Sequence, residues 1–401
     1  MSSNNPTIQN SPQELLRAIF STLTPKELAE CALVCKAWSS PARGRLYEHI
    51  DVRKGPNKMT YATRSAMLCQ TLDTMPVLRS IVRSLCVVSY IPTTILPEVR
   101  AIFLHYTAIS SIPSFTRIIP HLQKLEQISF HTNVSLTPLE NLLLLQAFGS
   151  LPLLRHLRYF AASSGPVRKP SQLVHSLNAL PPLQERRPQL MTLDVRNITE
   201  LGSFRASSSL EDLEWAFHPR SPLDLTHLRA LSVSTYRAAK YIMREVSGTL
   251  ESLTFTSASR ILGDTESQPP ITLPVLKYLC IPSETIDISL VANIHCPSLE
   301  CITLIWQSVT DLDPEFMNES DSPLFLTDRC ITNRSNYPNL KDMMVLVNAE
   351  PTERHPHISM LQKMLPRCTG RKISFETAEV QVGRSFVQVA YADKLNSGSG
   401  F

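Results

Sequence analysis

The sequence of 401 residues has only 11 glycines and contains neither a G-x-x-x-x-G-K-[ST] phosphate loop nor a G-x-G-x-x-G turn. It also lacks a G-x-S-x-G elbow, an H-E-x-x-H helix and paired C-x-x-C motifs, the usual local frameworks of nucleophilic and zinc chemistry. We therefore predict a protein that is not an enzyme and that binds no cofactor and no metal. The alternative is an enzyme whose site is assembled from residues distant in sequence, because such a site leaves no local spacing to read.

Long apolar segments are also missing, and no window approaches 18 consecutive apolar residues. A membrane-spanning helix needs about 18 or more such residues. The first residues, MSSNNPTIQN, are polar and lack the apolar core of a secretory signal. The nine cysteines are an odd number without regular spacing, which favours free thiols in a reducing compartment. We expect a soluble protein of the cytoplasm or nucleus, with no membrane partner.

Neither sign of charge dominates the chain. Lys and Arg number 39 and Asp and Glu 35, which gives a net charge of +4 with neutral histidines. Such a mixture predicts no basic face, so we expect no nucleic-acid partner. Hydrophobic residues make up 43% and charged residues 18%, a balance typical of folded proteins, and the length suits a small module plus a larger body.

Near its N-terminus the sequence contains two helix-start signals close together. Ser11-Pro12-Gln13-Glu14 has the layout of a capping box with proline at the first helical position, and Thr24-Pro25-Lys26-Glu27 repeats that layout. A third segment runs from Trp38 to Tyr47 before the chain turns extended near residues 50–52. Three short helices bury too little apolar surface to be stable alone, so a partner is expected. The first helix carries one wide apolar stripe, made of Leu15, Leu16, Ile19, Phe20 and Leu23.

The spacing of these residues resembles the F-box family. The matching strings are P-x-E-L-L-x-x-I-F-S-x-L from Pro12 to Leu23, E-L at Glu27 and Leu28, and L-V-C-K-x-W from Leu33 to Trp38. One departure is Ser11, where the family usually has leucine. The resemblance implies docking onto a Skp1-type adaptor and, through it, recruitment to a cullin-RING ubiquitin ligase. Some of the residues that it implies for Skp1 binding must instead hold the three helices together, and the sequence does not divide the two groups. The whole set is Pro12, Leu15, Leu16, Ile19, Leu23, Leu28, Val34, Trp38 and Leu46.

From residue 82 onward one short phrase recurs, in which apolar residues stand at the first, fourth and sixth positions. This is the L-x-x-L-x-L phrase of a leucine-rich repeat. From Leu190 to Leu299 the steps between first positions are 20, 18, 22, 26 and 23 residues, close to the usual range of about 20–29. The copies begin at Leu154, Leu190, Leu210, Leu228, Leu250, Leu276, Leu299 and Leu340, with weaker ones at Val82 and Leu125.

The body is similar to the leucine-rich repeats that follow F-boxes in many proteins, although the asparagine that usually follows the strand phrase is mostly missing. This resemblance implies an α/β fold class, with an N-terminal three-helix F-box followed by an irregular leucine-rich-repeat-like solenoid with parallel strands. The predicted organisation is a disordered tail at residues 1–10, the F-box at 11–52, a helical linker at 53–81, the repeat domain at 82–390 and a flexible tail at 391–401.

Positions three and five of each phrase fall on one face of the predicted sheet, where we expect solvated side chains that receive an unidentified protein substrate. The predicted function is therefore that of a substrate-recognition adaptor of an SCF-type (Skp1, cullin, F-box) ubiquitin ligase. Two alternatives are an F-box scaffold that delivers no substrate for ubiquitination, and a helical module that only caps the repeat array. The candidate substrate-binding residues are His156, Arg158, Thr192, Asp194, Asp212, Glu214, Ser252, Thr254 and Tyr278.

Overall fold

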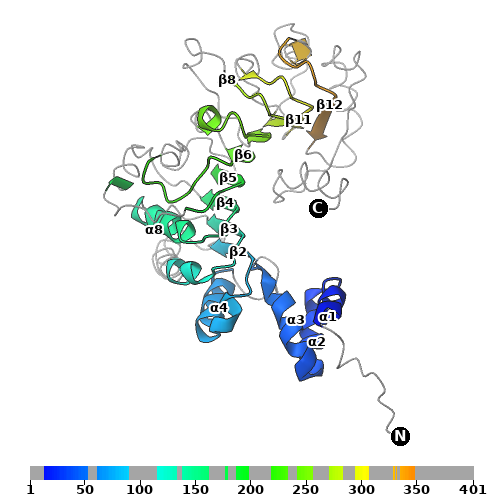
Figure 1. Ribbon diagram of the computed structural model, residues 1–401, viewed down its shortest axis with the longest axis vertical. Helices are drawn as coiled ribbons and strands as arrows, with labels where there is room; N and C mark the ends of the chain where they lie inside the picture. Colours follow the sequence, from blue (N-terminus) through cyan, green and yellow to red (C-terminus); the bar gives the residue numbers. More distant parts are fainter. Residues whose placement is uncertain are drawn as a thin grey trace, which may run out of the picture. The chain divides into compact units, whose positions relative to one another are not determined.

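The computed structural model divides the chain into two compact units, residues 1–164 with 175–189, and residues 165–174 with 190–401 (Figure 1). The predicted tails at 1–10 and 391–401 lie outside the residues that the structure describes. The predicted domain boundaries stay predictions. The described residues are 13–52, 61–89, 115–132, 138–161, 177–178, 187–197, 218–233, 242–255, 271–282, 294–306, 328–329, 331 and 335–347.

The first unit begins with the helices α1 (Gln13–Phe20), α2 (Pro25–Val34) and α3 (Lys36–Glu48). α2 starts where the sequence predicts, because the Thr24 side chain accepts a hydrogen bond from the Glu27 backbone N–H at 3.4 Å. In return, Glu27 Oε2 accepts from the Thr24 N–H at 2.7 Å, which completes a capping box. Cys35 has extended backbone, with φ −160° and ψ 165°, and this single residue separates α2 from α3.

A parallel sheet continues directly from the third helix. Its strands β1 (His49–Asp51), β2 (Ser84–Ser89), β3 (Gln127–Thr132) and β4 (His156–Ala161) follow one another in sequence order. β1 belongs to the predicted F-box segment, so that segment ends as a strand of this sheet. The helical elements of the unit further along the chain are α4 (Tyr61–Thr74), α5 (Pro76–Arg79), η3 (Ile119–His121) and α8 (Pro138–Gly149).

The second unit is also built on parallel strands. They lie in the order β5 (Thr192–Asn197), β6 (Ala230–Val233), β7 (Ser252–Phe255), β9 (Tyr278–Pro282), β11 (Cys301–Trp306) and β12 (Asp342–Val347). A separate parallel pair is formed by β8 (Ile271–Thr272) and β10 (Ile294–His295). Helices at the N-terminus followed by parallel sheet agree with the predicted α/β class.

The recurring phrase sets both where strands start and which residues form the core. In every described copy, the strand begins at the third position of the phrase. The fourth-position residues lie opposite one another in register and are fully buried, as for Leu85, Ile128 and Leu157 in the first unit. The copy expected at Leu210 lies outside the described residues, and β5 pairs directly with β6. The corresponding buried row of the second unit is Leu193, Leu231, Leu253, Leu279, Ile302 and Met343.

The helices of the described residues are short. None of them is long and apolar enough to cross a bilayer. The most apolar one, α8, packs on the first sheet, where its Asn141 side chain accepts a buried hydrogen bond from the Tyr159 hydroxyl of β4.

Candidate docking site

The first three helices enclose a small apolar core. Leu16 and Phe20 of α1, Leu28 of α2 and Ala42 of α3 are fully or almost fully buried there. The Phe20 and Trp38 rings meet edge to face, with their centroids 5.8 Å apart, an arrangement that aromatic pairs prefer. Around this centre pack the partly buried side chains of Leu23, Cys31, Ala32, Trp38 and Leu46.

The same helices also expose large apolar side chains to solvent. On α1, Leu15 is 52% exposed and Ile19 47% exposed. At the end of α2, Leu33 is 84% exposed and Val34 64% exposed. Four exposed apolar side chains on these two helices make this surface a candidate for contact with another protein. We call Leu15, Ile19, Leu33 and Val34 the docking residues.

The single stripe that the sequence predicts on α1 is thus two neighbouring rows. Residues four apart on a helix share one side, so Leu16 and Phe20 form the inner row and Leu15 and Ile19 the outer row. Leu16 and Leu28 are among the residues that hold the three helices together, because both are almost fully buried in the core. Pro12 lies outside the described residues.

Sequence reasoning did not single out Leu33, which is the most exposed of these four side chains. It belongs to the L-V-C-K-x-W string that carried the family resemblance, yet only Val34 and Trp38 of that string were assigned to the partner. The signal was available, because Leu33 and Leu28 are five positions apart and therefore lie on different sides of a helix. A leucine on the side away from the core at the end of a short helix is exposed.

The candidate substrate residues occupy the strand face that the sequence assigns to them, but several are not exposed. His156, Arg158, Thr192 and Tyr278 are partly exposed, and Asp212 and Glu214 lie outside the described residues. Contrary to the expectation of solvated side chains, Asp194, Ser252 and Thr254 are buried. These side chains are short, and neighbouring strands lie only about 4.8 Å away on each side of an inner strand. The expected receptor surface is therefore narrower than the sequence predicts.

Some titratable groups in the first and second units have altered acidity. Burial, with smaller contributions from Arg158 and Arg155, lowers the pKa of His156, so this imidazole is neutral at pH 7. Burial raises the pKa of the Cys296 thiol to about 12 and, together with Asp73, that of Cys69 to about 11. These two cysteines are therefore thiols and not thiolates at neutral pH.

Within the described residues there is no group of three or more His, Cys, Asp or Glu side chains that could hold a metal ion.

Three short helices, the second of which starts with a capping box, enclose a small core and expose leucine, isoleucine and valine side chains. The F-box-like family model matches residues 12–53, about a tenth of the chain. The chain therefore carries an F-box-like domain at these positions, and the predicted F-box is confirmed. F-box domains in general bind Skp1 in SCF complexes. No curated protein matches the chain.

Proposed function

We propose that this protein is a substrate-recognition adaptor of an SCF-type ubiquitin ligase. It docks onto a Skp1-type protein through Leu15, Ile19, Leu33 and Val34, and it binds a target protein on its strand-rich body. The observation that carries the proposal is the exposure of these four apolar side chains on a segment that matches the F-box-like family. Covering one such side chain completely contributes about 1.5–3 kcal/mol, so four partly exposed ones supply enough apolar area to anchor a partner.

The body of the proposed adaptor is an irregular leucine-rich-repeat-like solenoid. Support comes from the recurring phrase, since every described copy starts a strand at the same position and neighbouring strands pair in parallel with the phrases in register. Such arrays offer extended binding surfaces built from many small contacts. The candidate substrate residues that remain in this proposal are the partly exposed ones, His156, Arg158, Thr192 and Tyr278.

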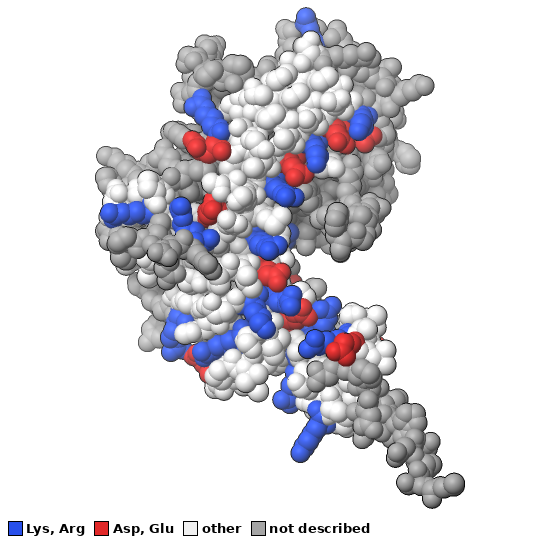
Figure 2. Space-filling model, viewed as in Figure 1, with Lys and Arg blue, Asp and Glu red and all other residues white. Residues whose placement is uncertain are grey.

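The proposed adaptor has no catalytic activity of its own, needs no cofactor or metal, and does not bind nucleic acid. Among the described residues on the face that Figure 2 shows, basic and acidic side chains are interspersed and no broad field has one sign. Such a surface does not attract a polyanion over a large area. Elemental analysis of the purified protein is expected to find no stoichiometric zinc, and a stoichiometric metal would revive a metal-domain interpretation.

Binding of the full chain to a purified Skp1-type protein tests the docking step. Replacing Ile19 and Val34 together by lysine is expected to abolish binding, because each change removes apolar contact and places a charge in the interface. The matched control is Leu139→Lys on α8, which changes an apolar side chain of similar exposure, 63%, outside the F-box-like domain. The control is expected to bind normally. Undiminished binding by the double variant would refute the docking assignment.

Proteins captured by the wild-type chain and by the Ile19→Lys/Val34→Lys variant test the receptor step. A target should be captured by both forms, because it binds the body, but its degradation in cells should require the form that binds Skp1. A captured protein whose lifetime is the same with both forms would favour a scaffold that delivers no substrate.

A further inference from the structure

The residue immediately before each strand from β1 to β7, and before β9, β11 and β12, is charged in nearly every case. We call these the rung residues; each stands at the second position of its phrase, or directly before β1. In the first unit they are Glu48, Arg83, Glu126 and Arg155, and in the second unit Met191, Arg229, Glu251, Lys277, Glu300 and Lys341. Apart from Met191, the sign of the charge alternates from each strand to the next within each unit.

The backbone places neighbouring rung residues side by side. In the second unit, the N–H of Glu251 donates to the carbonyl of Arg229 at 2.8 Å, and the N–H of Lys277 donates to the carbonyl of Glu251 at 2.8 Å. Glu300 and Lys341 continue the same pattern, each donating to the preceding rung residue at 2.9 Å. In the first unit, Arg83 donates to Glu48, Glu126 to Arg83, and Arg155 to Glu126, at 2.9, 2.8 and 2.8 Å.

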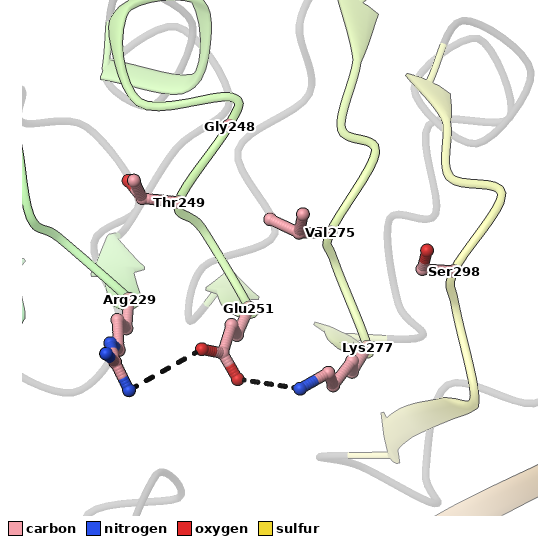
Figure 3. Close-up of a pocket in the computed structure, with 7 residues that line it drawn as sticks. All are labelled: Arg229, Gly248, Thr249, Glu251, Val275, Lys277 and Ser298. Atoms are coloured by element: carbon pink, nitrogen blue, oxygen red, sulfur yellow. Dashed lines mark hydrogen bonds and ion pairs between the residues drawn. The ribbon is translucent and has the colours of Figure 1, made fainter.

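The side chains of adjacent rung residues form ion pairs. Glu251 lies between two cations, 3.8 Å from Arg229 and 3.0 Å from the Lys277 ammonium, as Figure 3 shows. Lys341 pairs with Glu300 at 3.5 Å. In the first unit, Arg83 contacts both Glu48 at 3.5 Å and Glu126 at 3.3 Å. The hydrogen bond and the charge of Glu251, with a smaller contribution from Glu300, raise the pKa of Lys277.

Exposed pairs of this kind stabilise a protein little, so stability alone does not explain the regular alternation. Pairing errors do. The apolar positions of the phrases are nearly interchangeable, so they do not distinguish the correct neighbour of a strand from the next one along the chain. If a strand skipped its neighbour, every pair of charged rung residues brought together would have like charges: Glu48 with Glu126, Arg83 with Arg155, Arg229 with Lys277, Glu251 with Glu300, and Lys277 with Lys341.

We propose that the rung residues are a pairing code, in which alternating charge favours sequential neighbours and disfavours the pairing of strands that skip one repeat. Like charges directly opposite each other destabilise strand pairing, and misassembly of similar repeats is a characteristic failure of repeat proteins. The code includes Glu48 at the end of α3, so it also selects the position of β1, the strand that the F-box-like domain contributes.

The rung residues around Glu251 are accessible to water and dissolved ions. Arg229, Glu251 and Lys277 line a shallow pocket of about 370 Å³, together with Gly248, Thr249, Val275 and Ser298 (Figure 3). Because water and ions reach these side chains, their interactions are screened by salt, with a Debye length that falls to about 3 Å at 1 M. Salt dependence is therefore a readout of the code that a loss of core packing does not share.

The first test is Glu251→Lys in the full chain, which places three cations on adjacent strands. At low salt we expect the urea midpoint to fall by about 0.5 M and the refolding yield to fall with it. At 1 M NaCl most of both differences should disappear. The matched control is Glu245→Lys, which reverses the charge of an exposed glutamate in the same unit that does not precede a strand. A Glu251→Lys chain that refolds as well as Glu245→Lys at low salt would overturn the proposal.

The second test inverts the whole code of the second unit, by exchanging signs at Arg229, Glu251, Lys277, Glu300 and Lys341. This variant carries five changes but keeps the alternation, so it should refold like the wild type and better than Glu251→Lys. This variant still tests whether alternating charge guides strand pairing if the Glu251→Lys chain does not fold. A fivefold inversion that refolds no better than the single reversal would show that alternation does not guide pairing.

Discussion

Adjacent leucines on the first helix of the F-box-like domain offer a direct comparison between core and docking surface. Leu15 is 52% exposed and Leu16 only 3% exposed, although they are neighbours in sequence and in the same helix. Leu15→Ala and Leu16→Ala make the same chemical change with the same effect on helix propensity. Any difference between the two variants therefore reports the environment of the side chain.

The expected magnitudes differ widely. Leu16 packs with Phe20, Leu28 and Ala42, and truncating a buried leucine to alanine costs about 2–5 kcal/mol. If α1 to α3 open locally, this loss corresponds to a roughly 30-fold to several-thousand-fold rise in amide exchange in these helices. Leu15 is already half in water, so its truncation should change folding stability by about 0.5 kcal/mol. It should instead weaken binding of a Skp1-type protein by roughly fivefold, from about 1 kcal/mol of lost contact.

Hydrogen exchange of the full chain, followed peptide by peptide, measures the first effect, and calorimetry with a Skp1-type protein measures the second. Leu16→Ala should lose protection across α1 to α3, whereas Leu15→Ala should keep it and lose affinity. Equal protection in the two variants would contradict the assignment of Leu16 to the core. Unchanged affinity in Leu15→Ala would remove Leu15 from the docking residues without affecting the core assignment.

Substitutions of three further side chains, with their controls, test other parts of the structure. Trp38 is partly buried, and its Nε1 atom is buried without a hydrogen-bond partner. Trp38→Phe should therefore lower thermal stability much less than Trp38→Ala, which costs up to about 3–5 kcal/mol. A loss in Trp38→Phe as large as that in Trp38→Ala would contradict the unsatisfied N–H. Tyr159→Phe removes the hydrogen-bond donor to Asn141 and should lower the free energy of unfolding in denaturant by about 1–3 kcal/mol. Adding Asn141→Leu should recover most of this loss. No loss in Tyr159→Phe would show that the buried hydrogen bond is not formed. Because the pKa of His156 is lowered in the folded protein, the unfolded chain binds its proton more readily, and stability should fall as the pH drops below about 6.5. His156→Gln should weaken this dependence below about pH 6.5, and an identical pH profile for both proteins would show that His156 is not responsible.

The positions of strands follow from the sequence with little ambiguity. Each described copy of the phrase combines three apolar positions with a strand start at the third position, because the fourth and sixth residues must reach the same core. The weak copies at Val82 and Leu125 behave like the clean ones, and Val82, Leu125, Ile128 and Phe130 are all fully buried. Periodicity therefore identifies buried strand residues even where the spacing between copies is irregular.

The division of α1 into two rows does not follow from periodicity. Leu15, Leu16, Ile19 and Phe20 are all apolar and adjacent on the helical surface, so any rotation of the helix by about 100° still buries some of them. The rotation is fixed by α2 and α3, which contribute Leu28 and Ala42 to the core. That information is tertiary. The alternating charges before the strands, by contrast, are visible in the sequence once the phrases are aligned, and only the pairing of strands shows why they alternate.

The F-box-like domain and the strands of the first unit are joined by strand pairing. β1 follows α3 without a break and pairs with β2, with Ile50 opposite Leu85, and Glu48 at the end of α3 contacts Arg83 before β2. When α1 to α3 open in the Leu16→Ala variant, β2 therefore loses its pairing with β1. Repeat arrays pass stability mainly between adjacent elements, so exchange should rise strongly in α1 to α3, measurably in β2 and little in β4. Exchange that rises in the helices but not in β2 would show that β1 does not hold the F-box-like domain to the sheet, whereas a uniform rise through β4 would show that the three helices cap the whole unit.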